Sequence, residues 1–149
     1  MPMRVVLQRT SGVEVWIESQ RHSATGAGLL ALVGTRPGDT EAACRFLADK
    51  TVNLRIFEDD AGKMNLSALD VRAEIMVVSQ FTLYADCRRG RRPSFSTAQE
   101  PAAAERLYRY YAERVTASGL VTRSGLFGAV MDVRFNNSGP VTIILDHDA

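Results

Sequence analysis

The chain has 149 residues, a length that fits one domain and allows roughly two-thirds of the unfolded surface to be buried on folding. Apolar residues make up 46% and charged residues 23%, which excludes a disordered chain, and no apolar run approaches the roughly 18 residues of a membrane span. The formal net charge of +1 excludes a strong pull on nucleic acid by the whole molecule, so such a contact needs a local patch. We expect one soluble domain over residues 1–149.

Two strands are predicted near the N-terminus. Residues 4–9 are expected to form the first, and residues 13–18 alternate between apolar side chains and either charged ones or Trp16. The Ser11-Gly12 pair suits a tight connection, so we expect the two strands to form a hairpin. Trp16 then stands on an otherwise polar strand face, where it can line a contact with a second copy of the chain.

Two short apolar runs and one helix are predicted next. Residues 28–34 and 75–78 are bounded by polar residues or glycine, which is typical of central strands buried on both faces. Asp39 is expected to cap a helix over residues 40–52, because a carboxylate accepts hydrogen bonds from the free amides of the first turn.

The remaining chain predicts a turn, a second helix and two closing strands. Gly62 marks a turn, and a helix begins near Pro101, which suits a first helical turn, and ends before Gly119. Residues 131–135 alternate and residues 141–145 form an apolar run, so both predict strands. About seven strands and two helices in mixed order favour an α/β (mixed α+β) sandwich in which helices cover one face of a sheet.

The familiar catalytic and metal-binding patterns are missing. His22 and His147 are the only histidines and have no ligand spacing, so we expect no metal site, and no glycine pattern indicates a nucleotide cofactor. Cys44 and Cys87 lie far apart in sequence, which favours free thiols in a reducing cytoplasm.

In two segments, polar residues follow or interrupt apolar strands, at positions where a buried strand is normally apolar. The first, Ser79-Gln80-Phe81-Thr82-Leu83, directly follows an apolar run, and the second is Asn137-Ser138-Gly139-Pro140-Val141-Thr142. Their polar groups can form a binding site, or they can satisfy local backbone groups in ordinary turns. The residues alone leave both interpretations open.

A third segment is strongly basic. Cys87-Arg88-Arg89-Gly90-Arg91-Arg92-Pro93-Ser94-Phe95 carries four arginines in a glycine-bearing loop, with an aromatic ring close behind. Arginines at this density can bind phosphates, and the ring of Phe95 can stack on a base or pack against one. A solvated basic loop is the other interpretation.

Taken together, these segments resemble the D-aminoacyl-tRNA deacylase family over nearly the whole chain. The matching landmarks occur in order: Val6-Leu7-Gln8-Arg9, Leu54-Arg55-Ile56-Phe57, Gly62-Lys63-Met64-Asn65-Leu66, Ser79 to Leu83, Arg92-Pro93-Ser94-Phe95 and Asn137 to Thr142. Thr10 stands where relatives commonly have valine, and Ser138 where they commonly have aspartate. Both lie outside the parts of the motifs that carry function in the family.

The resemblance implies a β/β/α three-layer sandwich, a homodimer and an active site near the subunit boundary. In the family, the Ser79 motif of one subunit meets the Gly139-Pro140 motif of the other. That Gly-Pro bond is cis in the family, so that backbone carbonyls form the wall that meets the α-carbon of the substrate. Arg9 matches the family arginine that tethers this backbone.

The resemblance also implies a mechanism without a protein nucleophile or cofactor. An aminoacyl ester is already activated, so the protein needs only to orient it and to stabilise an oxyanion, for which one donor contributes about 3 to 4 kcal/mol. In the family the backbone at the Ser79 motif binds the carbonyl and the 2′-hydroxyl of the substrate assists. Thr82 then has a structural or positioning role, because no general base stands near it in sequence.

The expected site residues fall into four groups. The catalytic segment is Ser79, Gln80, Phe81 and Thr82, the selectivity motif is Gly139 and Pro140, the supporting residues are Arg9, Met131, Asn137, Val141 and Thr142, and the RNA-binding residues are Lys63, Arg88, Arg89, Arg91, Arg92 and Phe95. The expected partner is the aminoacylated 3′ end of tRNA. Two alternatives stay open, namely a related deacylase with a trans Gly-Pro bond that accepts certain L-aminoacyl-tRNAs, and a non-catalytic RNA-binding module. The D-amino acid should be released together with free tRNA, and glycyl-tRNA should also be hydrolysed.

Overall fold

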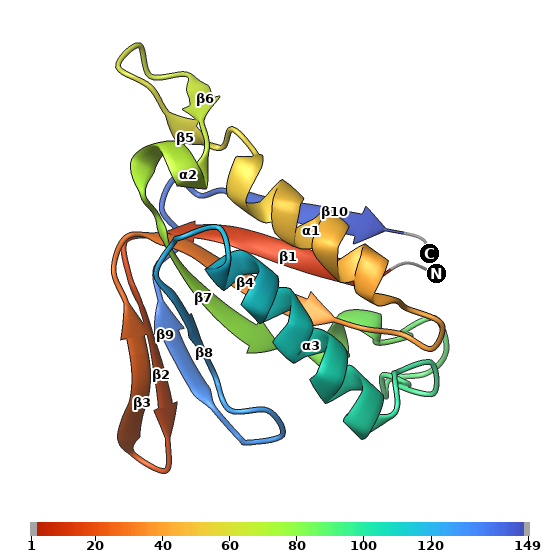
Figure 1. The fold of residues 1–149 in the computed structure, drawn as a ribbon. Helices are drawn as coiled ribbons and strands as arrows, with labels where there is room; N and C mark the ends of the chain where they lie inside the picture. The colour runs from red at the N-terminus through yellow and green to blue at the C-terminus, as the bar shows by residue number, and fades with distance from the viewer. Residues whose placement is uncertain (1–2, 148–149) are drawn as a thin grey trace.

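The computed structural model describes residues 3–147 and has a mixed α/β fold (Figure 1). In this part of the chain the elements follow in the order β1 (Met3–Thr10), β2 (Val13–Ile17), β3 (Gln20–Thr25), β4 (Gly28–Gly34), α1 (Glu41–Asn53), β5 (Phe57–Glu58), β6 (Met64–Leu66), α2 (Ala68–Val71), β7 (Glu74–Ser79), the 3-10 helix η1 (Phe81–Tyr84), α3 (Pro101–Thr116), β8 (Thr122–Ser124), β9 (Asp132–Phe135) and β10 (Thr142–His147). The predicted mixed α/β class is confirmed.

The strands form three sheets. The largest has five strands in the order β10-β1-β4-β7-β8, in which β4 pairs with β7 and β7 with β8 in parallel, while the other pairs are antiparallel. A second sheet has the order β3-β2-β9, and β5 and β6 form a separate hairpin. The two parallel pairs bring the carboxyl ends of β4 and β7 to the same edge of the large sheet.

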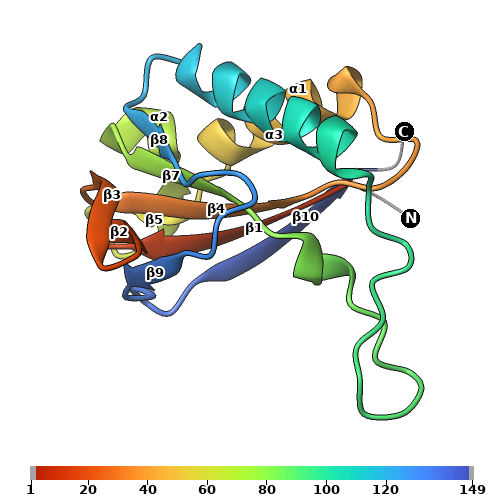
Figure 2. The ribbon, with the colours of Figure 1, turned by 90° about the horizontal axis from the view of Figure 1, so that it is seen from below.

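Apolar side chains of the large sheet bury themselves on both of its faces. Along β4, Leu29, Ala31 and Val33 belong to the core that includes α1 and α3, whereas Leu30 belongs to a smaller core shared with β2. This alternation follows from the two-residue period of a strand. Figure 2 shows α1 and α3 on one side of the five-stranded sheet and the β3-β2-β9 sheet near the other. The apolar runs at β4 and β7 are therefore buried on both faces, as the sequence predicts.

The predicted N-terminal hairpin is wrong. β1 pairs with β10 and β4, whereas β2 pairs with β3 and β9 in the other sheet. At Ser11-Gly12 the chain crosses between sheets, and the Gly12 amide donates to Thr10 Oγ1 at 3.0 Å. A short glycine-bearing connection fits such a crossing as well as it fits a hairpin, and only the tertiary pairing distinguishes them.

The predicted positions of the two helices are confirmed, but the predicted N-cap residue of the first helix is wrong. α1 is capped by Thr40, whose hydroxyl accepts from the Ala43 amide at 3.3 Å. Asp39, the predicted cap, instead accepts a short hydrogen bond from the Arg36 amide within the preceding turn. α3 begins at Pro101, as predicted, with the carboxylate of Glu100 accepting from the amides of its first turn. Within residues 3–147, no helix is long and apolar enough to cross a bilayer.

Candidate active site

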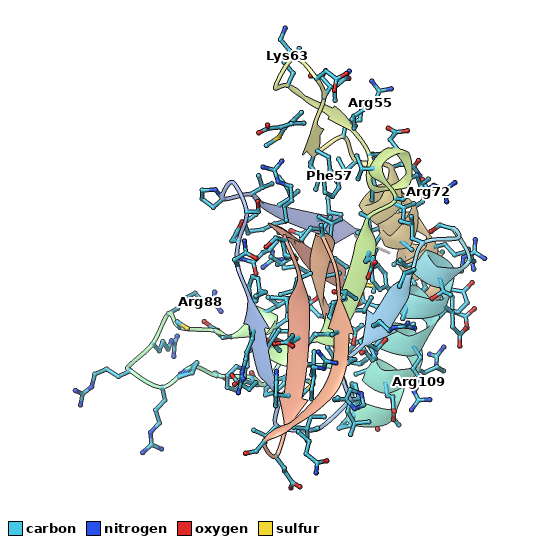
Figure 3. All side chains as sticks on the ribbon, turned by 90° about the vertical axis from the view of Figure 1, so that its left-hand side faces the viewer. Arg55, Phe57, Lys63, Arg72, Arg88 and Arg109 are labelled. Atoms are coloured by element: carbon cyan, nitrogen blue, oxygen red, sulfur yellow. The ribbon has the colours of Figure 1, made fainter. Side chains whose placement is uncertain are left out.

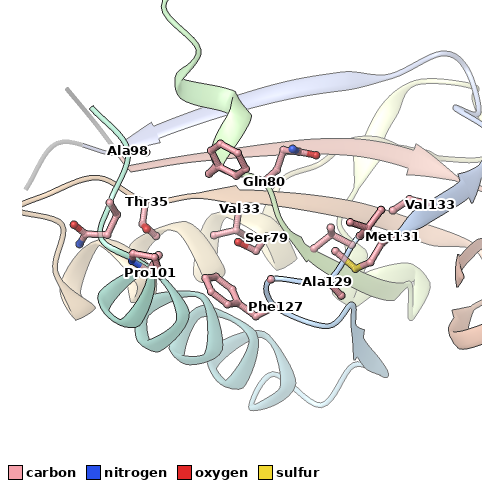
Figure 4. A pocket seen from close by; sticks show the side chains of 16 residues that line it. Val33, Thr35, Ser79, Gln80, Ala98, Pro101, Phe127, Ala129, Met131 and Val133 are labelled. Carbon is pink, nitrogen blue, oxygen red and sulfur yellow. The ribbon is translucent and has the colours of Figure 1, made fainter. Parts of the chain in front are cut away.

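A cavity of about 590 Å³ lies where β4 and β7 end. This edge, at the carboxyl ends of parallel strands, is where open α/β sheets commonly bind ligands. Figure 4 shows Ser79 and Gln80 on one wall, Pro101 at the amino end of α3 on another, and Phe127 and Met131 on the loop before β9. The full lining is Val33, Thr35, Val78, Ser79, Gln80, Phe81, Ala98, Gln99, Pro101, Ala104, Phe127, Gly128, Ala129, Val130, Met131 and Val133. We call it the Ser79 cavity.

The backbone after β7 is fixed at its first residue and then turns sharply. The Gln80 amide donates to the Val33 carbonyl at 2.8 Å, which extends the pairing with β4 by one step. The chain then enters η1, whose Tyr84 hydroxyl is buried and donates to the Gly34 carbonyl at 2.8 Å. Within residues 3–147, the amides of Phe81 and Thr82 have no recorded acceptor. The amide of Phe81, which lines the cavity, and that of its neighbour Thr82 therefore stay available as donors.

The side chains of this segment do not form a nucleophile–base pair. The Thr82 hydroxyl accepts a short hydrogen bond from Gln80 Nε2, is exposed, and is not part of the described cavity lining. Ser79 is half-buried in the wall. Among the described lining residues there is no histidine, carboxylate, lysine, arginine, tyrosine or cysteine. The cavity can orient a ligand and donate hydrogen bonds, but it offers no side-chain general base.

The segment of residues 137–142 is a tightly braced loop at the surface. Arg9 Nε donates to the Ser138 carbonyl at 2.9 Å, and its Nη1 donates to the Ile56 carbonyl at 2.9 Å. The backbone adds two hydrogen bonds, from the Arg9 amide to the Val141 carbonyl at 3.1 Å and from the Ser138 amide to the Arg9 carbonyl at 2.7 Å. Asn137 closes the loop, because its Oδ1 accepts from the Val141 amide at 2.7 Å. Three hydrogen bonds thus join Arg9 to the backbone of this loop.

Gly139 and Pro140 form the exposed tip of this loop, and their peptide bond is cis. Gly139 has φ +134°, and a methyl group there would stand 2.9 Å from Arg9 Nη2 and from Val141 Cγ2. Only glycine fits this position without a shift. Gly139 lines a different cavity from Ser79, together with Arg9 and Ser138. A single chain therefore does not bring the two predicted motifs together. The Asn137 side chain stays within its own loop, where its Nδ2 also donates to Thr142 Oγ1 at 2.8 Å.

Met131 lies in the cavity wall and supports the loop that completes it. Its sulfur accepts from the Leu126 amide at 3.4 Å, and a methyl group on Gly125 would stand 2.6 Å from that sulfur. The Phe127 ring lies 5.9 Å from the ring of Tyr108 on α3. The loop wall over residues 127–130 was missed by sequence reasoning, because an apolar stretch without periodicity gives no signal for a binding wall.

The arginine-rich segment projects away from the body of the protein (Figures 2 and 3). Asp86 and Ser94 close its neck with two backbone hydrogen bonds of 2.8 and 2.9 Å. Arg88 is held by the Asp86 carboxylate through Nε at 2.9 Å and Nη2 at 2.8 Å, and these bonds lower the pKa of Asp86 to about 2. Arg89, Arg91 and Arg92 are exposed and, within residues 3–147, have no recorded acceptor. Three guanidinium groups thus remain available for phosphates. We call residues 86–94 the arginine loop.

Three other predicted residues take positions that the sequence does not indicate. Phe95 is half-buried, with its ring centroid 5.1 Å from that of Phe81 at an interplanar angle of 68°. Lys63 is exposed at the tip of the β5–β6 hairpin, well away from the arginine loop (Figure 3). Trp16 is partly covered by Arg134, whose guanidinium carbon lies 4.3 Å from the ring centroid. The ring of Trp16 is therefore less available for a partner than its strand pattern suggests.

The cysteines are free thiols in different settings. Cys44 is buried on α1, and burial raises the pKa of its thiol to about 12. Cys87 is exposed in the arginine loop. Within residues 3–147, no group of histidine, cysteine and acidic side chains is arranged to hold a metal ion.

Comparison with known proteins identifies the family. The model of the D-Tyr-tRNA(Tyr) deacylase family matches residues 6–146. The chain is 51% identical over 144 residues to a D-aminoacyl-tRNA deacylase of Halothermothrix orenii, covering 97% of each chain. It is 50% identical over 147 residues to a D-aminoacyl-tRNA deacylase of Exiguobacterium sp., covering 99% of this chain and 100% of the relative.

Solved structures agree with this assignment at the level of the fold. One described as c-Myc DNA Unwinding Element Binding Protein superposes with a TM-score of 0.91 at 36% identity, over 99% of this chain and 100% of the other. Another, described as a probable eukaryotic D-amino acid tRNA deacylase, superposes with a TM-score of 0.84 at 19% identity, again over 99% and 100%. The chain belongs to the D-Tyr-tRNA(Tyr) deacylase family.

Proposed function

We propose that this protein hydrolyses the ester of D-aminoacyl-tRNA in the cytoplasm and releases the free D-amino acid and tRNA. The observation that carries the proposal is the family match over residues 6–146 in a chain whose Ser79 cavity presents backbone donors. The substrate class follows from the family, and the cavity fits the chemistry. An aminoacyl ester needs orientation and stabilisation of an oxyanion more than it needs a nucleophilic side chain.

The reaction would proceed within the Ser79 cavity. The apolar wall around Phe127 suits the adenine ring of the terminal nucleotide, since an aromatic face stacks on any base. Water adds to the carbonyl carbon of the ester, the bond to the 3′-oxygen of the ribose breaks, and that oxygen leaves as a hydroxyl. The free amides of Phe81 and Thr82 would donate to the developing oxyanion, and one such donor contributes about 3 to 4 kcal/mol. The 2′-hydroxyl of the substrate would relay the proton.

Selectivity would come from a second copy of the chain. Gly139 and Pro140 are exposed and firmly held by Arg9, yet they do not line the cavity of their own chain. Presented to the Ser79 cavity of a partner, this rigid tip would meet the α-carbon of the bound amino acid and clash with an L side chain. The exposed side chains of Phe81 (57%) and Ile144 (60%) offer apolar surface for such a homodimer.

The homodimer can be tested by mixing two inactive variants. Gly139→Ala would damage the tip and Phe81→Pro the cavity backbone, and each variant alone would be inactive. Refolded or exchanged mixtures would regain activity if one intact site forms in each mixed dimer. Mixtures that stay inactive, or a monomer of 16.4 kDa by light scattering with full activity, would contradict the shared site.

Contact with the rest of the tRNA would come from the arginine loop, with Lys63 as a separate contact on the β5–β6 hairpin. The phosphate backbone is recognised by guanidinium groups without regard to sequence. A formal net charge of only +1 makes such a local patch necessary.

The decisive experiment compares turnover of D-tyrosyl-tRNA and L-tyrosyl-tRNA by the purified protein. The proposal expects hydrolysis of the D ester and a spared L ester. Hydrolysis of the L ester would instead favour the related deacylase activity on certain L-aminoacyl-tRNAs. Protection of both esters, together with tight tRNA binding, would favour a non-catalytic RNA-binding module.

A further inference from the structure

The Phe95 side chain connects the arginine loop to the backbone of the Ser79 cavity. Its ring lies 5.1 Å from that of Phe81 in an edge-on arrangement of 68°, which is a favourable geometry for an aromatic pair. Phe95 directly follows the loop neck, where Asp86 and Ser94 pair through two backbone hydrogen bonds. It also precedes a turn in which the Ala98 amide donates to the Phe95 carbonyl at 3.1 Å.

One ring of this contact lies in the cavity wall, and the other lies close to wall residues in the sequence. Phe81 lines the Ser79 cavity, and so do Ala98 and Gln99, which follow Phe95 by three and four residues. Phe81 is the first residue of η1, and its side chain is 57% exposed. The preceding Gln80 has no side-chain cap for η1. Within one chain, the ring contact described for Phe81 is the one with Phe95, so the position of the Phe81 ring depends on that contact.

We propose that Phe95 is a positioning residue of the deacylase reaction, which acts through Phe81 and not by stacking on RNA. By packing against the Phe81 ring, it fixes the backbone at Phe81 and Thr82, whose free amides face no acceptor within residues 3–147. The inference rests on the proposed function. It assigns the arginines of the loop to tRNA binding and the aromatic residue behind them to the geometry of the chemical step.

Half-burial of Phe95 supports this role over base stacking. A stacking platform needs an open ring face, whereas Phe95 is half-buried and is already paired with an aromatic ring. The neck hydrogen bonds lie between Phe95 and the arginines of the loop, and Arg88 is also bonded to Asp86 at the neck. Occupancy of the loop by phosphates is therefore separable from the position of Phe95.

The test separates binding from the chemical step. In Phe95→Ala, the single-turnover rate on D-tyrosyl-tRNA at saturating enzyme is expected to fall by about 10- to 100-fold, the scale of a small misplacement of reacting groups. Affinity for the tRNA and its salt dependence are expected to stay unchanged. Phe95→Tyr, which keeps the ring, is expected to restore the rate. Phe46→Ala is the matched control. Phe46 lies on α1, is also partly exposed, and has its ring centroid 4.5 Å from that of an aromatic neighbour, His147.

Hydrogen exchange gives a readout that does not need catalysis. The amides of Leu83 and Ala85 are bonded to the carbonyls of Gln80 and Thr82, at 3.3 and 3.1 Å. In Phe95→Ala these amides should exchange faster, while those of α1 should not change. If Phe95→Ala does not fold, Phe95→Leu and a double-mutant cycle with Phe81→Leu replace it, and the two changes should be non-additive.

Three outcomes would overturn the inference. Weaker tRNA binding with an unchanged saturating rate would make Phe95 an RNA contact. An unchanged rate together with unchanged exchange at Leu83 and Ala85 would show that the Phe95–Phe81 contact does not position this backbone. Additive effects of the Phe81 and Phe95 changes on the rate would show that the two rings act independently. A wild-type protein that hydrolyses no D-tyrosyl-tRNA would instead refute the proposed function, and the exchange measurement alone would then decide whether Phe95 fixes this backbone.

Discussion

Arg9 Nε donates a 2.9 Å hydrogen bond to the carbonyl oxygen of Ser138, which lies 129 positions further along the chain. The Arg9 side chain is only 13% exposed, and its Nη2 lies 3.8 Å from the Glu58 carboxylate. A charged donor to a partly buried carbonyl is stronger than a neutral one, so this contact makes the surface tip beyond it rigid. The predictions for that tip depend on this tether.

Gly139→Ala is expected to abolish most deacylation while leaving the protein folded. The added methyl group would stand 2.9 Å from both Arg9 Nη2 and Val141 Cγ2, so the tip has to move. Gly38→Ala is the control, because Gly38 also has a positive φ, +93°, but has nothing within 4 Å of the added carbon. Each change should cost about 1 to 3 kcal/mol of backbone strain. Thermal unfolding should show the larger destabilisation for Gly139→Ala, because the clash adds to the strain, and the single-turnover rate should fall in Gly139→Ala alone. Full activity of Gly139→Ala would contradict the role of the tip.

Thr82→Ala is expected to retain deacylation. The hydroxyl is occupied by Gln80 Nε2, and its loss leaves the backbone donors in place. Loss of one such hydrogen bond predicts a rate lowered by less than about tenfold. Removal of a true nucleophile costs far more, roughly 10⁶-fold in a serine protease. A well-folded Thr82→Ala protein without measurable single-turnover activity would restore Thr82 as the nucleophile.

Changing Arg89, Arg91 and Arg92 together to alanine is expected to weaken tRNA binding and to flatten its salt dependence. Released counterions contribute about 0.7 to 0.9 to the slope of log K against log salt for each phosphate contact, so the slope should shrink by about 2 to 3. Arg88→Ala is the control, because Arg88 is held by Asp86, whose lowered pKa of about 2 keeps it ionised at any working pH. An unchanged slope in the triple variant would assign the loop to structure or solvent.

Glycyl-tRNA is expected to be hydrolysed together with D-alanyl-tRNA, while L-alanyl-tRNA is spared. A pocket that merely fails to attract a methyl group discriminates against it by only about 1 to 3 kcal/mol, which is too little to protect the large excess of L esters. Rejection must then be steric, and glycine has no side chain to clash. Single-turnover rates on the three esters would decide. Rejection of glycine along with L-alanine would mean that the pocket positively recognises a D side chain.

Much of the fold was predictable where burial dominates the local sequence. The apolar runs of β4 and β7 and the amphipathic stripe of α3 reflect burial directly, and Pro101 sets the start of its helix. β3 was missed because its outer residues are polar and exposed. The short α2 had a readable signal, since Ser67 and Asp70 form a reciprocal cap. Pairing of β2 with β3 and β9 depends on contacts distant in sequence, which no local pattern specifies.

The candidate site divides in the same way. The polar residues after a buried strand made the Ser79 segment a candidate but left an ordinary turn equally open, and only the family resemblance assigned a role to it and to Arg9. The packing of Phe95 against Phe81 was not predictable, because the two residues lie 14 positions apart and no periodic pattern links them. The two loop segments meet only because the neck at Asp86 and Ser94 folds the chain back on itself.

The wall of the Ser79 cavity carries no ionisable side chain among its described residues. A pH profile has inflections where participating groups change protonation, so the chemical step should show none that belong to the wall. The remaining titration is that of the substrate, whose α-amino group has a reference pKa of about 7.7 to 8.0. When the amino group of the substrate is acylated, the plot of the rate against pH should then show no inflection in the neutral range. Such a catalyst would keep its chemical step in mild acid that protonates the active-site thiolate or imidazole of other hydrolases.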